Sequence, residues 1–208
     1  GGILADDMGL GKTVQILSAV AAVRAHKGGD ANAPVLVVAP TSVVGVWVEQ
    51  ARQFTPQLRV RTVTETATRR GTTITQEAAN ADIIVTSYTL VRLEAQQWSQ
   101  VRLGGVVIDE AQAVKNPRTA TYRALRDLEA PWKLAVSGTP IENSLSDLWS
   151  LLSLTCPGLL PPWETFQQQV RRPIENGADP TLLARLTAYV APFVLRRTKE
   201  EVAPDLPD

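Results

Sequence analysis

The residues best suited to chemistry form a glycine-containing loop near the start of the chain, Asp6-Asp7-Met8-Gly9-Leu10-Gly11-Lys12-Thr13. Gly9 and Gly11 can adopt backbone conformations that a side chain forbids, so successive loop N–H groups and the next helix can face one anion. In such a loop Lys12 would reach the terminal phosphates of a nucleotide, and the Thr13 hydroxyl would hold Mg²⁺. The loop therefore predicts a phosphate site.

The loop departs from the general pattern G-x-x-x-x-G-K-[ST] at Asp6, where that pattern has glycine. Taken alone, the loop fits an ordinary glycine-rich turn before a helix about as well. Its context favours the phosphate site, because Ile16, Leu17, Val20 and Val23 recur at helical spacing. This periodicity predicts that the loop opens an amphipathic helix, as a phosphate loop must.

A second group of chemistry-bearing residues follows the apolar run Val106-Val107-Ile108, which predicts a strand. Mg²⁺ prefers oxygen ligands, so Asp109 at the end of this strand could hold the ion while Glu110 orients or deprotonates an attacking water. A buried strand often ends in charged residues that have no catalytic use. Because residues 6–13 are expected at the same edge of the sheet, the two motifs together predict a site that hydrolyses a nucleotide.

A third motif, Ser137-Gly138-Thr139, follows another apolar run and taken alone fits an ordinary turn. Small hydroxyl side chains at this position could hydrogen-bond both to the acidic pair and to a neighbouring loop. We therefore expect this segment to sense the terminal phosphate and to relay its loss.

Short apolar runs alternate with helical patterns along most of the chain. Runs that are apolar on both faces are typical of a parallel sheet covered by helices. Strands are expected up to Leu4 and at 35–39, 60–63, 83–86, 106–108, 134–136 and 193–195, and helices at 42–54, 76–80, 88–95 and 119–128. This order predicts an α/β fold with a doubly wound, mostly parallel sheet, whose ligands collect at the carboxyl ends of the strands.

From residue 145 the pattern becomes helical, with expected helices at 147–154, 164–171 and 180–190. We expect a nucleotide-binding lobe over residues 1–144, a helical protrusion over 145–190, and a return strand with the start of a linker over 191–208. The abrupt beginning and end of the chain suggest a piece of a larger protein.

The composition excludes several classes of function. Of 208 residues 44% are hydrophobic, and 21 Lys and Arg balance 21 Asp and Glu, so no general basic field indicates nucleic acid. The single Cys156 and the single His26 leave no internal disulfide and no zinc ligand set. No run approaches the roughly 18 apolar residues of a membrane span, and no leader is recognisable, so we expect an intracellular protein without a membrane partner.

These motifs, in this order, resemble those of the Swi/Snf-type ATPases, which are DNA translocases of helicase superfamily two. An acidic residue is usual in that group at the position of Asp6, so the departure from the general loop becomes a family feature. The resemblance covers essentially the whole chain, through residues 6–13, Pro40-Thr41-Ser42, Thr86-Ser87-Tyr88, Asp109-Glu110-Ala111-Gln112, Ser137-Gly138-Thr139-Pro140-Ile141-Glu142-Asn143 and Pro192-Phe193-Val194-Leu195-Arg196-Arg197-Thr198-Lys199.

The resemblance implies a P-loop, RecA-like lobe that binds ATP through residues 6–13. It implies Mg²⁺ on Thr13 and Asp109, and catalytic roles for Lys12, Asp109 and Glu110. Coupling between ATP and DNA is expected from Gln112, Ser137, Gly138 and Thr139.

The resemblance also implies double-stranded DNA as a partner, bound through its backbone without sequence specificity. The expected contacts are Thr41, Ser42, Ser87 and Tyr88. A second RecA-like lobe of the same protein would supply arginine fingers, so this chain alone should hydrolyse ATP hardly at all. The motor would displace or remodel a protein cargo on DNA, in the cytoplasm or nucleoid of a prokaryote, which the composition slightly favours, or in a eukaryotic nucleus.

Two other functions fit the same motifs. One is a strand-separating or RNA-acting helicase lobe of the same superfamily, and the other is a nucleotide-gated DNA-binding module without turnover. The intact Lys12, Thr13, Asp109 and Glu110 argue against the module. Stimulation of ATP hydrolysis by duplex DNA, single strands or RNA would discriminate between the two motors.

Overall fold

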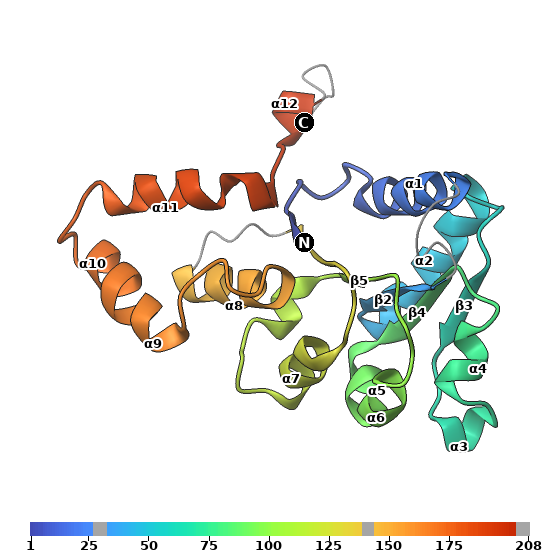
Figure 1. The fold of residues 1–208 in the computed structure, drawn as a ribbon. Coiled ribbons are helices and arrows are strands. Elements are labelled where there is room, and N and C mark those ends of the chain that lie inside the picture. The colour runs from blue at the N-terminus through green and yellow to red at the C-terminus, as the bar shows by residue number, and fades with distance from the viewer. Residues whose placement is uncertain (27–32, 139–143, 203–208) are drawn as a thin grey trace.

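A parallel sheet forms the centre of the computed structural model, which describes residues 1–26, 33–138 and 144–202 (Figure 1). Its strands lie in the order β3-β4-β2-β5-β6-β1-β7, and each neighbouring pair is parallel. They are β1 (Gly2–Leu4), β2 (Val35–Ala39), β3 (Val60–Val63), β4 (Ile83–Ser87), β5 (Gly105–Ile108), β6 (Lys133–Val136) and β7 (Val194–Leu195). Every expected strand is present, which confirms the α/β fold predicted from the apolar runs.

Helices cover both faces of the sheet, which is why its central strands are apolar on both sides (Figure 1). One face packs against α1 (Lys12–Ala25) and α2 (Thr41–Phe54), and the other against α5 (Tyr88–Leu93), α6 (Ala95–Trp98) and α7 (Ala120–Asp127). Successive residues of β2 alternate between the two cores, so that Val37 joins the first and Val38 the second. Burying each such side chain contributes roughly 1.5–3 kcal/mol.

The short elements α3 (Ala67–Arg70), α4 (Ile74–Ala78) and η1 (Ala111–Val114) complete the lobe. After it comes α8 (Leu145–Thr155), which buries Leu148, Leu151 and Leu152 in the same core as the sheet. Farther helices extend to the left of Figure 1, namely α9 (Trp163–Phe166), η2 (Gln167–Arg171), α10 (Arg172–Glu175) and α11 (Leu182–Val190). The chain then returns through η3 (Ala191–Phe193) and β7 to α12 (Lys199–Val202). The domain boundaries at residues 145 and 191 stay predictions.

The structure differs from the sequence-based expectation in two places. The helix expected over 164–171 is instead α9, a π-helical turn at η2, and then α10. Pro173 explains the wider turn, because it lacks the N–H that would continue the α-helical ladder to Gln169. Val23, which shares the spacing of the buried positions on α1, is 63% exposed. Within the described ranges, no helix is both long and apolar enough to cross a membrane.

Candidate nucleotide site

The loop between β1 and α1 folds around the ammonium group of Lys12. Gly9 and Gly11 have φ angles of 91° and 72°, in the left-handed region that favours glycine, as the sequence predicts. Lys12 Nζ donates to the carbonyl oxygens of Asp6 at 2.6 Å and Asp7 at 2.9 Å. No side chain caps α1, so the N–H groups of its first turn stay available to an anion.

The Asp6 carboxylate points away from this anion-binding side of the loop. It is fully buried and accepts hydrogen bonds from the backbone N–H of Arg197 at 3.0 Å, from the Arg197 guanidinium and from Gln15 Nε2 at 3.3 Å. Burial acts to raise the pKa of Asp6, but the hydrogen bonds and charge of Arg197 outweigh burial and lower it. Asp6 therefore supports the loop from behind with its side chain and faces Lys12 only with its carbonyl.

Asp109 follows β5 directly and is held by an indole from α2. Trp47 Nε1 donates to Asp109 Oδ2 at 2.8 Å, and the backbone N–H of Glu110 donates to Asp109 Oδ1 at 3.0 Å. Burial raises the pKa of Asp109, while these hydrogen bonds and the positive charge of Lys12 act in the opposite direction. Because β5 pairs with β6 and β6 pairs with β1, all in parallel, Asp109 after β5 and the loop after β1 leave the sheet at the same edge.

Glu110 adopts a left-handed backbone conformation, with φ 50° and ψ 50°. Among the described residues it is the only one other than glycine with a positive φ. Such strained positions cluster at functional sites, where the surrounding structure holds them in place. Glu110 stands between β5 and η1, so this left-handed residue joins the strand to the 3-10 helix.

A hydrogen-bonded chain joins Glu110 to the end of β6. Gln112 Nε2 donates to Glu110 Oε2, and Ser137 Oγ donates to Gln112 Oε1 at 2.9 Å. The turn after β6 also lies against the phosphate loop, since a Cβ atom on Gly138 would meet Met8 Cγ at 2.7 Å and Lys12 Nζ at 3.6 Å. A side chain at residue 138 would therefore displace the Met8 side chain and approach Lys12, and Thr139 lies outside the described residues.

The four residues expected at DNA have different surroundings. Thr41 and Ser42 are exposed at the beginning of α2, after β2. The Ser87 hydroxyl is buried and accepts from the N–H of Leu90 at 3.3 Å. The Tyr88 hydroxyl donates to the carbonyl of Asp109, and burial, with the charges of Asp109 and Glu110, raises its pKa far above the usual value. Their DNA-binding roles stay predictions, and Tyr88 has a second task in supporting the acidic motif.

Three supporting residues were assigned no role in the nucleotide site from the sequence. Trp47 orients Asp109, while Gln15 and Arg197 hold the carboxylate of Asp6. Asp6, an acidic residue at a position where the general loop has glycine, was the sequence feature that could have indicated Gln15 and Arg197. A carboxylate buried at that position needs a hydrogen-bonding partner. Its partner lies 191 residues away, too far for sequence spacing to reveal.

The family model of the SNF2-related domain matches residues 1–208, the whole chain. YwqA of Bacillus subtilis, which bears the provisional name of an ATP-dependent helicase/translocase, is 38% identical over 210 residues, which cover 100% of this chain and 23% of YwqA. BTAF1 of Arabidopsis thaliana, a TATA-binding protein-associated factor, is 34% identical over 224 residues, which cover 100% of this chain and 11% of BTAF1. The chain thus spans less than a quarter of the length of these relatives.

A solved structure shows the same fold over the same range. The Sulfolobus solfataricus SWI2/SNF2 ATPase core in complex with dsDNA matches with a TM-score of 0.87 and 36% identity, over 100% of this chain and 42% of that one. The likeness therefore extends over the whole chain, with its parallel sheet and covering helices. The chain belongs to the SNF2-related domain family.

Proposed function

We propose that this chain is the first nucleotide-binding lobe of an ATP-driven translocase on double-stranded DNA, which remodels or displaces protein bound to DNA. The observation that carries the proposal is the convergence of Lys12, Asp109 and Glu110 at one sheet edge. The turn at Gly138 contacts the same loop. Relatives named as an ATP-dependent helicase/translocase and as a TATA-binding protein-associated factor support an action on DNA-bound protein.

The residue types of the site support ATP with Mg²⁺ as its ligand. Gly9 and Gly11 give the loop the left-handed residues that a phosphate loop needs, and the turn at Gly138 lies close to Met8 and Lys12. The Thr13 hydroxyl and the Asp109 carboxylate are the hard oxygen ligands for Mg²⁺, which when bound would neutralise phosphate charge. Lys12 would exchange its two carbonyl partners for phosphate oxygens, which carry more negative charge.

Glu110 is the proposed general base or water-orienting residue. Its carboxylate is fixed by Gln112, so the group stands in one orientation before a water arrives. Because Gln112 also accepts from Ser137, a shift of the β6 turn changes the position of Glu110. We propose that this chain of hydrogen bonds from Glu110 through Gln112 to Ser137 couples nucleotide binding to the remainder of the motor.

Contacts to DNA are proposed at the beginning of α2, where Thr41 and Ser42 expose hydroxyls and first-turn N–H groups. The solved relative in complex with dsDNA supports this partner. We further propose that a second RecA-like lobe supplies the arginine fingers, since the chain covers only 42% of that ATPase core. An ATP-driven DNA motor acts where ATP and DNA are both present. The proposed location is therefore the cytoplasm or nucleoid of a bacterium, or a nucleus.

The test measures ATP hydrolysis by the full-length natural protein with duplex DNA, single-stranded DNA, RNA or no nucleic acid. Stimulation by duplex DNA is expected, whereas stimulation by RNA alone would contradict the proposal. In parallel, the 208-residue chain by itself should bind ATP with Mg²⁺ and hydrolyse it roughly 10³- to 10⁵-fold more slowly. Turnover by this chain at the rate of the whole protein would disprove the need for a second lobe.

A further inference from the structure

Arg197 connects the phosphate loop to the segment that follows β7. Its backbone N–H and its guanidinium both donate to the buried Asp6 carboxylate, and its NH2 group also donates to Gln15 Oε1 at 2.9 Å. Gln15 in turn donates to the carbonyl of Leu10 at 2.9 Å. One guanidinium therefore reaches both ends of the loop, through Asp6 at its start and through Gln15 at Leu10.

The main chain makes the same connection. Beyond the β1–β7 pairing, the N–H of Ala5 donates to the carbonyl of Leu195 at 2.7 Å and that of Asp7 to the carbonyl of Arg197 at 3.1 Å. The N–H of Lys199 then donates to the Asp7 carboxylate at 3.2 Å. Residues 195–199 thus run beside residues 4–7 and bind the start of the loop.

The same two residues of the loop, Asp6 and Asp7, also accept from Lys12 through their carbonyl oxygens. Arg197 therefore holds Asp6 from one side while the nucleotide-binding ammonium holds it from the other. Without the Arg197 guanidinium the buried carboxylate would keep only the backbone N–H of residue 197 and the longer bond from Gln15, and it would draw in water or a new partner. Either change would move the carbonyls that set the position of Lys12.

Resting on the proposed function of this loop, we propose that Arg197 is a positioning residue for the nucleotide site. Arg197 fixes the loop in its phosphate-binding shape without touching the nucleotide. Because such coupling is reciprocal, bound ATP must also strengthen the attachment of residues 195–199 to the loop. The strength with which the segment after β7 is attached therefore depends on whether the site holds ATP.

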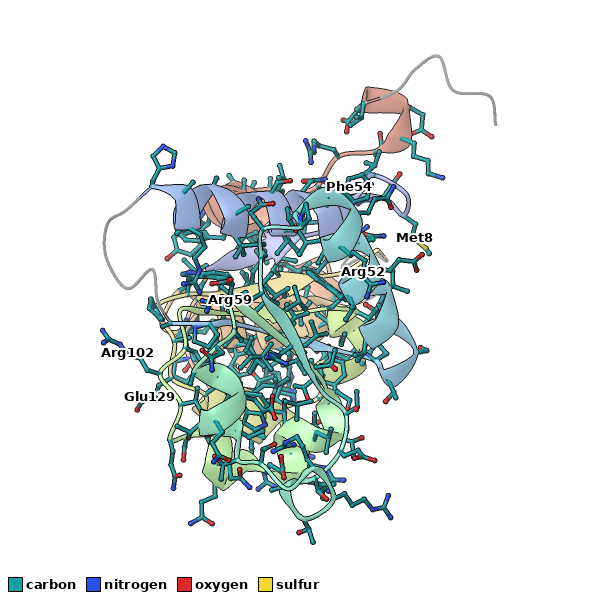
Figure 2. All side chains as sticks on the ribbon, turned by 90° about the vertical axis from the view of Figure 1, so that its right-hand side faces the viewer. Met8, Arg52, Phe54, Arg59, Arg102 and Glu129 are labelled. Carbon is teal, nitrogen blue, oxygen red and sulfur yellow. The ribbon has the colours of Figure 1, made fainter. Side chains whose placement is uncertain are left out.

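The molecule contains a matched control at the opposite end of the sheet. Arg59 donates to the buried Asp82 carboxylate through its backbone N–H at 2.8 Å, its Nε at 3.0 Å and its NH2 at 3.1 Å. This pair has the same chemistry and joins two neighbouring parallel strands in the same way. Figure 2 shows Arg59 well apart from Met8 of the phosphate loop.

The experiment compares Arg197→Met with Arg59→Met in the full-length natural protein. It measures ATP–Mg²⁺ affinity by calorimetry, and amide hydrogen exchange of residues 7–11 without nucleotide. Arg197→Met should weaken ATP binding by about tenfold or more and accelerate loop exchange by a similar factor. Arg59→Met should change both quantities by less than about twofold. If Arg197→Met does not fold, Arg197→Lys, which keeps the charge but not the two-pronged contact, takes its place under the same criteria.

Unchanged affinity and unchanged loop exchange in the Arg197 variant would overturn the inference, as would equal effects of the two arginine substitutions. If the unsubstituted protein does not bind ATP, the proposed function fails. The exchange measurement still decides, independently of ATP, whether Arg197 holds the loop.

Discussion

Asp6 and Asp82 are both buried carboxylates held by an arginine that flanks a neighbouring strand, but they lie at opposite ends of the sheet. Each pair stands in register. Arg59 and Asp82 come one residue before paired strands, whereas Asp6 and Arg197 come two residues after paired strands. At the amino ends of the strands a further arginine, Arg24, approaches Asp82 at 3.7 Å.

The surroundings of the two pairs give them different consequences. The Asp82 pair lies where β3 and β4 begin, so it fixes the start of two strands and the packing of α1. The Asp6 pair borders the glycine loop, in which Gly9 and Gly11 are left-handed. In this loop the carbonyl oxygens of Asp6 and Asp7 accept hydrogen bonds from Lys12. The same interaction therefore serves stability at one end of the sheet and loop geometry at the other, because only the carboxyl ends of the strands carry reactive loops.

Glu110→Gln, at the carboxyl ends of the strands, should have the largest effect on turnover. Loss of a general base typically lowers turnover by about 10²- to 10⁴-fold, while glutamine keeps the size of the side chain and its acceptor for Gln112. DNA-stimulated ATP hydrolysis of the full-length protein measures this loss, and ATP affinity should change little. Glu129→Gln is the control, because Glu129 is exposed on the side opposite to Met8 (Figure 2). Full turnover in Glu110→Gln would remove this residue from the mechanism.

Trp47→Phe should have a smaller effect at the same edge. The substitution deletes the indole N–H that orients Asp109, and loss of such a supporting hydrogen bond lowers metal affinity or activity by about 10- to 100-fold. Trp98→Phe is a matched control, since both indoles are 1% exposed and Trp98 Nε1 has no hydrogen-bond partner within the described part of the chain. Comparable melting temperatures but unequal turnover are expected, and equal turnover would show that Asp109 needs no such support.

Asp82→Asn should affect stability alone, and only above acidic pH. Burial acts to raise the pKa of Asp82, but Arg59 and Arg24 outweigh it and lower the pKa below 3.8 in the folded chain. A lowered folded pKa contributes stability that is fully present above the unfolded pKa and is lost as the pH falls through the folded value. Urea unfolding should therefore show a deficit for Asp82→Asn at pH 7 that shrinks below about pH 4. A deficit that is the same at pH 7 and pH 3 would mean that the charge of Asp82 is irrelevant.

Local pattern was sufficient for most of the framework. The run at 35–39 matches β2 residue for residue, because a short β-branched run that is apolar on both faces suits a covered parallel strand and little else. The run at 60–63 also matches β3, an edge strand on which Arg61 and Thr62 are exposed. Gly9 and Gly11 were expected at left-handed positions and are there, since the loop pattern requires them. The π-helical turn at η2 was missed, because a single proline shifts the ladder without changing the apolar spacing.

The sequence by itself determined the positions of the strands along the chain, the positions of the phosphate loop and of the acidic motif, and the edge of the sheet where they meet. These follow from local periodicity and from the rule that parallel strands share one carboxyl edge. Only the tertiary structure decided which distant side chains hold these groups in place: Trp47 on Asp109, Gln112 between Glu110 and Ser137, and Arg197 on Asp6. The reason is physical, because a buried polar group needs a partner but any residue that the fold brings close can supply it.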